Sequence, residues 1–279
     1  MSASGNFQFD EIGRWSELKL EIVEKYGAAY TTAFSGRRGR NLTKYYIDAF
    51  SGAGVHLSKE TGRQVEGSPA RALKVRPPFD HFYFIDMNPE KTADLKTLCE
   101  GRRDVDVITD DATFYLTQKL LPNIQFEKFN RALCLLDPYG LHLDWEVMKR
   151  AGQTRAVDMF LNFPVMDMNR NAIWRNPERA PLDGIERMTR FWGDETWKQA
   201  AYADSPQYEF FSNPDRVKQD NDAIVAAFRE RLIKVAGFSF VPEPLPMKNR
   251  NNAVVYYLFL ASPKPVAERI IEGIFAKYR

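Results

Sequence analysis

Short apolar runs alternate with helical patterns through the middle of the chain. Five of these runs are continuous rather than alternating in polarity, which is typical of strands covered on both faces. They span residues 45–50, 82–86, 105–108, 132–137 and 157–163. Between them, residues 67–73 and 88–98 begin with a capping residue followed by proline, as helices do. The alternation predicts a parallel β-sheet with right-handed helical crossovers.

Both ends of the chain extend this pattern. Residues 15–28 carry apolar side chains at helical spacing. Near the C-terminus, a helix ending at Gly237 precedes two more apolar runs, 238–241 and 254–262, and a last helix follows Ser262. We expect these two runs to form an antiparallel hairpin, with the residues between them as its loop.

The predicted fold is therefore α/β and Rossmann-like. It has a mostly parallel seven-stranded sheet, an antiparallel C-terminal hairpin and helices on both faces, which is the layout of class I S-adenosylmethionine-dependent methyltransferases. Residues 1–44 are expected to form an N-terminal helical extension with a basic loop, and residues 45–279 the methyltransferase-like domain. Residues 166–215, rich in aromatic side chains, are expected to be an insertion of short helices and loops.

Composition limits the class of protein further. The net charge is only +2, so any contact with nucleic acid must come from local patches. The loop before the first strand holds such a patch, and it is either a solvated loop or a phosphate-contacting site for DNA or RNA through Arg37, Arg38, Arg40 and Lys44.

No apolar stretch approaches the roughly 20 residues of a membrane helix. The two cysteines, Cys99 and Cys134, are far apart and form no CxxC pair. We therefore expect a soluble, reduced, cytoplasmic protein without a membrane partner.

Acidic residues stand at the ends of the first three predicted strands. Asp48 is followed by Phe50 and by the glycines of a tight turn, Gly52 and Gly54, where a ligand could approach the backbone closely. Asp86 could accept both hydroxyls of a ribose, or it could cap the next helix. Asp111, or its neighbour Asp110, could bind an adenine amino group, or it could cap a helix.

The fourth strand runs into Asp137, Pro138, Tyr139 and Gly140. Methyltransferases that act on amino groups carry an acidic or amide residue, prolines and an aromatic residue at this position. There Asp137 would hold the target amine and the Tyr139 ring would stack on a base. The alternative is a strand-end aspartate that orders a turn. Because parallel strands end at one edge of a sheet, we expect all these acids to share one rim.

Other chemistries fit the sequence less well. The three histidines, His56, His81 and His142, are isolated and show no metal-ligand spacing, so no metal site is predicted. A magnesium-dependent nuclease using Asp48, Asp86 and Asp137 is an alternative, although it gives the glycine turn no role. A nicotinamide oxidoreductase lacks its third glycine, because Leu57 stands there.

Six motifs together resemble the three-Cys-motif partner family of bacteria and phages. They are DAFSGAG, GSPARAL, FYFIDMNPEK, ALCLLDPYG, AVDMFLNFPV and TRFWGDETWK, and the likeness spans about residues 15–278. The resemblance implies a methyltransferase fold, S-adenosylmethionine as cofactor, and association with a three-Cys-motif protein that is similar to radical S-adenosylmethionine proteins.

By position, the resemblance implies that Asp48, Gly52, Gly54, Asp86 and Asp111 line the cofactor and that Asp137 faces its methyl group. The family pattern has Gly-Asp-Ala after the third strand, where this chain has Asp110-Asp111-Ala112.

Two functions thus lead. One is a methyltransferase acting on a nucleic-acid base or a similar amine. The other is a non-catalytic docking module, in which exposed aromatic side chains of 189–211, such as Trp192 and Trp197, anchor a partner protein.

Overall fold

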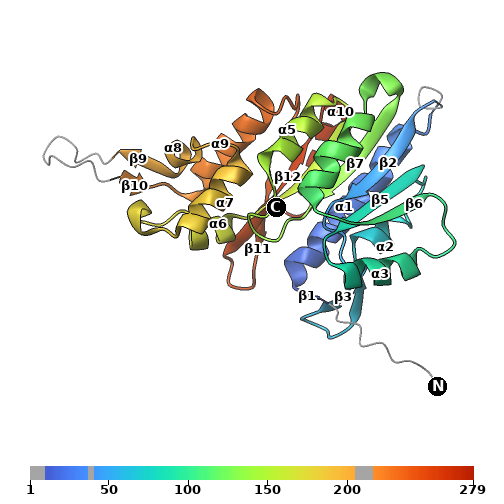
Figure 1. Cartoon of the computed structure of the whole chain (residues 1–279), viewed down its shortest axis with the longest axis horizontal. Coiled ribbons are helices and arrows are strands. Elements are labelled where there is room, and N and C mark those ends of the chain that lie inside the picture. The colour runs from blue at the N-terminus through green and yellow to red at the C-terminus, as the bar shows by residue number, and fades with distance from the viewer. Residues whose placement is uncertain (1–9, 37–40, 205–215) are drawn as a thin grey trace, which may run out of the picture.

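A seven-stranded sheet forms the centre of the molecule (Figure 1). The computed structural model describes residues 10–36, 41–204 and 216–279. The strand order is β11-β12-β8-β7-β2-β5-β6, and only β12 runs antiparallel to its neighbours in this sheet. The bounds are β2 (Thr43–Asp48), β5 (His81–Asp86), β6 (Val105–Thr109), β7 (Asn130–Leu136), β8 (Val157–Phe163), β11 (Leu245–Lys248) and β12 (Val254–Ala261).

The order of the strands reverses between β2 and β7. From β2 the chain proceeds to β5 and β6 on one side, and then crosses back to β7 and β8 on the other. Ligands of open α/β sheets bind beyond the carboxyl ends of the strands at such a reversal. The topology confirms the predicted class I methyltransferase-like fold, including its antiparallel C-terminal hairpin.

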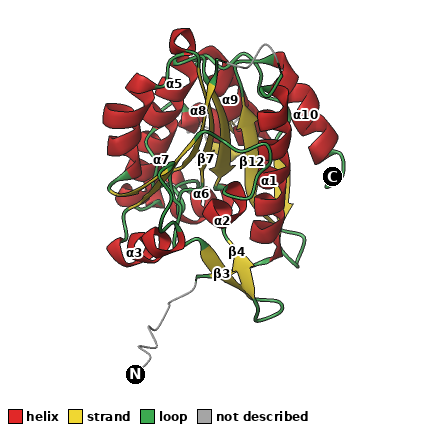
Figure 2. Cartoon of the chain, turned by 90° about the vertical axis from the view of Figure 1, so that its right-hand side faces the viewer, coloured by secondary structure: helices red, strands yellow, loops and turns green. Residues whose placement is uncertain are grey.

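Helices cover both faces of the sheet, as predicted (Figure 2). One core joins the sheet to four helices: α1 (Arg14–Ala33), α2 (Ser68–Ala72), α3 (Pro89–Leu98) and α10 (Pro265–Phe275). The other core joins it to α4 (Ala112–Phe114) with the π-helical turn Tyr115–Leu120, α5 (Trp145–Gln153), α7 (Leu182–Trp192) and α9 (Asn221–Lys234). Short 3-10 turns at Leu121–Asn123 and Phe126–Lys128 lead into β7.

The first strand of the C-terminal hairpin is not where the sequence predicted it. Residues 238–241 contribute only a single bridge, between Phe240 and Ser262. The strand is Leu245–Lys248, inside the segment expected to be a loop. This strand contains Pro246, which has no N–H group. An edge strand tolerates a proline because one of its sides has no neighbouring strand that would need a hydrogen bond.

The segment after β8 forms a helical insertion, at the left of Figure 1. It contains α6 (Val165–Asn171), the 3-10 turn Pro177–Arg179, α7 and α8 (Trp197–Ala201). A strand pair that the sequence reading missed, β9 (Tyr202–Asp204) with β10 (Arg216–Lys218), follows α8. The aromatic residues Tyr208, Phe210 and Phe211 lie outside the described residues.

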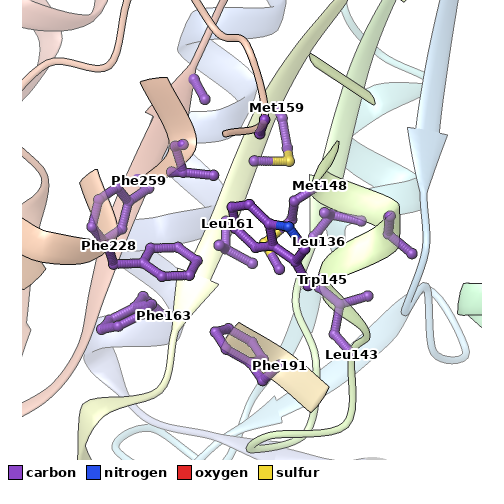
Figure 3. Close-up of a cluster of buried hydrophobic side chains, with 14 of the residues drawn as sticks. Leu136, Leu143, Trp145, Met148, Met159, Leu161, Phe163, Phe191, Phe228 and Phe259 are labelled. Atoms are coloured by element: carbon purple, nitrogen blue, oxygen red, sulfur yellow. The ribbon is translucent and has the colours of Figure 1, made fainter. Parts of the chain in front are cut away.

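Most aromatic side chains in the described part of the insertion pack into the core, and Trp174 is exposed. Figure 3 shows Phe191 beside Phe163 and Phe228, whose ring centroids are 4.5 Å apart. Trp192 and Trp197 are each only 2% exposed. The prediction that these two tryptophans are exposed docking anchors is therefore wrong, because both are buried in the interior.

A second, small sheet follows the glycine turn and was not predicted. It consists of β1 (Glu11–Ile12), β3 (Val55–Ser58) and β4 (Gln64–Glu66), with β3 in the middle. The β3–β4 hairpin turns at Gly62, whose φ of +66° suits glycine. Among the helices of the described part, none is long and apolar enough to cross a membrane.

Candidate functional site

The ends of β5 and β2 are joined at the predicted rim. The Gly52 amide donates to Asp86 Oδ2 at 2.9 Å, and the Asn88 amide donates to Asp86 Oδ1 at 2.9 Å. The Asp86 carboxylate, half-buried at the end of β5, thus holds the glycine turn against its own strand. Both hydrogen bonds come from backbone amides, which is the charge-assisted kind that fixes a loop firmly.

The two glycines of the turn have different roles. Gly52 and Gly54 have φ values of +61° and +81°, a region that side chains rarely adopt. A Cβ on Gly54 would lie 2.9 Å from Leu98, so this glycine lets the turn pack against α3. The nearest atom to a Cβ on Gly52 would be in the His56 ring, 3.9 Å away, so this side of the turn leaves room for a ligand. Phe50 is half-buried and packs against the core.

Asp48 stands at the end of β2 as predicted, but it does not face an open rim. Its side chain is fully buried, and neither carboxylate oxygen has a hydrogen-bond partner. Burial is the main cause that raises its pKa to about 7, and the charge of Asp137 adds to the rise. The Ser68 hydroxyl, the Phe50 amide and Lys19 lie near enough to oppose that rise without meeting hydrogen-bond geometry.

Asp137, at the end of β7, is held by two side chains that the sequence reading did not assign. The ammonium of Lys19, on α1, forms an ion pair with Asp137 Oδ2. Asn162, on β8, donates from Nδ2 to Asp137 Oδ1 at 2.8 Å. Lys19 is buried, whereas 30% of the Asp137 side chain remains exposed. These two contacts fix the orientation of the carboxylate, and part of the side chain is exposed at the rim while Lys19 occupies Oδ2.

The two residues after Asp137 differ sharply in exposure. Pro138 is buried, whereas Tyr139 is 89% exposed, so its ring is free to stack on a planar ligand. Gly140 follows with a φ of +61°, and a Cβ there would lie 2.5 Å from Asp167 Oδ2. That same carboxylate oxygen accepts the Leu141 amide at 3.2 Å, which anchors the turn.

Asp111 acts as a helix cap in the structure. Its Oδ1 accepts the Phe114 amide at 2.8 Å at the start of α4, and Asp110 accepts the Asp111 amide at 2.8 Å. Asp111 also lines an open groove of about 490 Å³ between α4, the loop 141–144 and α7. The helix-capping alternative is thus realised, and Asp111 still borders a space next to the rim.

Lys44, at the end of the basic loop, lies away from this rim. Lys44 belongs to the start of β2, at the opposite edge of the sheet from Asp48, and pairs with Asp80 at 3.3 Å. Arg37, Arg38 and Arg40 lie outside the described residues. Among the residues that the structure describes, no group of three or more His, Cys, Asp or Glu side chains is arranged to hold a metal ion. The nuclease alternative, with Asp48, Asp86 and Asp137 as ligands, finds no support there.

The strand order and the rim define a class I methyltransferase-like fold. Protein LPL1258 from Legionella pneumophila, of the DUF519 family, is similar with a TM-score of 0.55 and 13% identity, covering 93% of this chain and 91% of that one. At this identity the likeness shows the fold alone.

A putative S-adenosylmethionine-dependent methyltransferase from Listeria monocytogenes is more distant. Its TM-score is 0.41 and its identity 12%, covering 86% of this chain and 98% of that one. The sequence matches no protein-family model and no curated protein. Membership of the three-Cys-motif partner family therefore stays a prediction.

Proposed function

We propose that this protein transfers a methyl group from S-adenosylmethionine to an amino group of a nucleic-acid base or a similar amine. The observation that carries the proposal is the joined rim, where Asp86 holds the glycine turn beside the end of β7. The rim offers a carboxylate, a glycine turn open on one side and, one strand further, an exposed aromatic ring after Asp137.

The residues at the rim fit an adenosine-bearing cofactor. Asp86 would accept ribose hydroxyls, and Gly52 would let the cofactor approach the backbone. Met87, next to Asp86, is 73% exposed and offers an apolar surface for a base. When bound, the cofactor supplies an activated methyl group on a sulfonium, so the protein has mainly to orient and desolvate.

Asp137 and Tyr139 would handle the acceptor. Asp137 would accept a hydrogen bond from the target amine and so direct its lone pair at the methyl carbon. The cofactor would supply the methyl group to that nitrogen and leave as the neutral thioether, and the Asp137 carboxylate or solvent would take the proton that the amine loses. Tyr139, with its exposed ring, would stack on the base.

Calorimetry with S-adenosylmethionine tests the proposal. We expect the wild-type protein to bind and Asp86→Asn to weaken binding about 10-fold or more, because a charge-assisted hydrogen bond to ribose is lost. Glu100→Gln, an exposed change after α3, is the matched control. Absence of binding at millimolar ligand, or equal affinity of both variants, would refute the cofactor site.

We further propose that the protein works with a three-Cys-motif protein and contacts DNA or RNA through Arg37, Arg38 and Arg40. The set of six motifs supports the first idea, and the basic composition of the loop supports the second. Co-purification of the two co-expressed chains, and oligonucleotide binding by an Arg37→Ala, Arg38→Ala, Arg40→Ala variant, test them separately. Independent elution of the chains, or unchanged oligonucleotide affinity, would refute the respective idea.

A further inference from the structure

A buried cluster beneath the rim holds more carboxylates than cations. Lys19 pairs with Asp137, and Asp48, at the end of the neighbouring strand, is fully buried with both oxygens unpartnered. Asn162 donates to Asp137, but its own Oδ1 is also buried without a donor. A buried polar group without a partner is costly, so this arrangement calls for a reason.

Lys19 occupies the place that the proposed acceptor needs. An ammonium nitrogen on Asp137 Oδ2 is where the proposed mechanism requires the amino group of the substrate. The ion pair and the acceptor therefore compete for one carboxylate. When Lys19 leaves, its charge needs another partner, because an unpaired buried ammonium is strongly unfavourable.

Asp48 is suited to be that partner. It pairs in register with Leu135 of β7, two residues before Asp137, and both its oxygens are buried without a hydrogen-bond partner. Lys19 sits on α1, and its four-carbon side chain is flexible enough to turn between two neighbouring strand ends. Lys19 would then serve as the counter-charge of both Asp137 and Asp48, one at a time.

We propose that Lys19 is a positioning residue shared by Asp137 and Asp48: it holds Asp137 until an acceptor amine arrives, and then pairs with Asp48. This inference rests on the proposed function for the identity of the incoming amine. A primary amine has two N–H groups, one for Asp137 and one for the free Asn162 Oδ1. The exchange thus satisfies the acceptors that the resting cluster leaves open, and it favours primary amines over groups with one N–H or none.

Carboxyl carbon NMR on aspartate-labelled protein tests the exchange without substrate or cofactor. Asp137→Asn removes the resting partner of Lys19, so we expect Lys19 to pair with Asp48. Lys19→Met should then raise the Asp48 midpoint in the Asp137→Asn background by about one to three units, the effect of a close cation on an aspartate. An Asp48 midpoint that Lys19→Met leaves unchanged in the Asp137→Asn background would overturn the proposal.

Kinetics provide the second arm once an acceptor is known. Lys19→Met should lower kcat and shift the pH profile of kcat, whereas Lys25→Met, which alters an exposed pair on the same helix, should leave both unchanged. A loss of stability without a shift of the pH profile would show a merely structural lysine. Because the NMR cycle needs no methyl transfer, failure of the proposed function and failure of the exchange can be told apart.

Discussion

Asp48 and Asp158 are both buried, but their hydrogen bonding differs. Asp48 has no hydrogen-bond partner, and Asp158, at the start of β8, has two. It accepts the Tyr26 hydroxyl and the Ser262 hydroxyl, both at 2.6 Å. Burial raises the pKa of Asp158 to about 6, and that of Asp48 to about 7. Burial thus shifts both titrations upward from the range of an exposed aspartate.

The raised pKa of Asp48 predicts that stability falls with rising pH. Its contribution is fully present below the unfolded pKa of about 4 and is lost progressively up to about pH 7. The slope is about 1.4 kcal/mol of unfolding free energy per pH unit. Asp48→Asn, which stays neutral, should remove the Asp48 part of the slope and leave the part that Asp158 contributes. Urea unfolding between pH 4 and 8 measures it, and parallel curves for both proteins would contradict the assignment.

The sequence predicts the position of a residue well where that position depends on one strand or helix alone. Asp86 and Asp137 stand at strand ends because each follows a continuous apolar run, and parallel strands bring such ends to one edge. Lys19 could not be assigned in this way, because its partner lies 118 residues further along the chain. A lysine at a buried helical position was the available signal, and it does not reveal which acid it meets.

At the scale of elements, capping was predicted from local chemistry and is confirmed for α3. The Asn88 side chain accepts the amides of Glu90 at 2.8 Å and Lys91 at 3.3 Å, and proline follows at the first turn. These contacts need only neighbouring residues, so the sequence determines them. The β3–β4 hairpin was missed because its strands have only 4 and 3 residues, too few to show a clear alternation, and β4 is mostly exposed.

The Asn88 cap carries its own prediction. Asn88→Ala should lower the unfolding free energy by about 1 kcal/mol, because two backbone amides at the start of α3 lose their acceptor. Asn88→Asp should retain most of the stabilisation by the cap, since a carboxylate also accepts hydrogen bonds from these amides. Thermal or urea unfolding measures the change. An alanine variant as stable as wild type would show that the cap is dispensable.

Across the whole molecule, the helical insertion is part of the main core. Trp192 donates from its ring nitrogen to Thr196 at 3.0 Å and packs against Phe228. Composition could not distinguish this burial from exposure, because aromatic residues serve both cores and interfaces. The buried residues of the insertion thus belong to the same core as β8.

Truncating Trp192 therefore affects folding. Trp192→Ala should cost about 3–5 kcal/mol of unfolding free energy, as for other large buried side chains. Trp174→Ala, at a site 36% exposed, should cost clearly less and is the matched control. Urea unfolding compares them. Similar small losses for both variants would contradict the burial of Trp192.

Helix α1 connects the first segment of the chain to both edges of the sheet. It carries Lys19 to Asp137 at one edge, and Tyr26 to Asp158 near the other. Although residues 1–44 read as an extension in the sequence, a shortened protein beginning at β2 would lose a counter-charge and a hydroxyl donor in one step. Any domain boundary drawn at residue 44 for engineering or chimera design would therefore separate Asp137 from its cation.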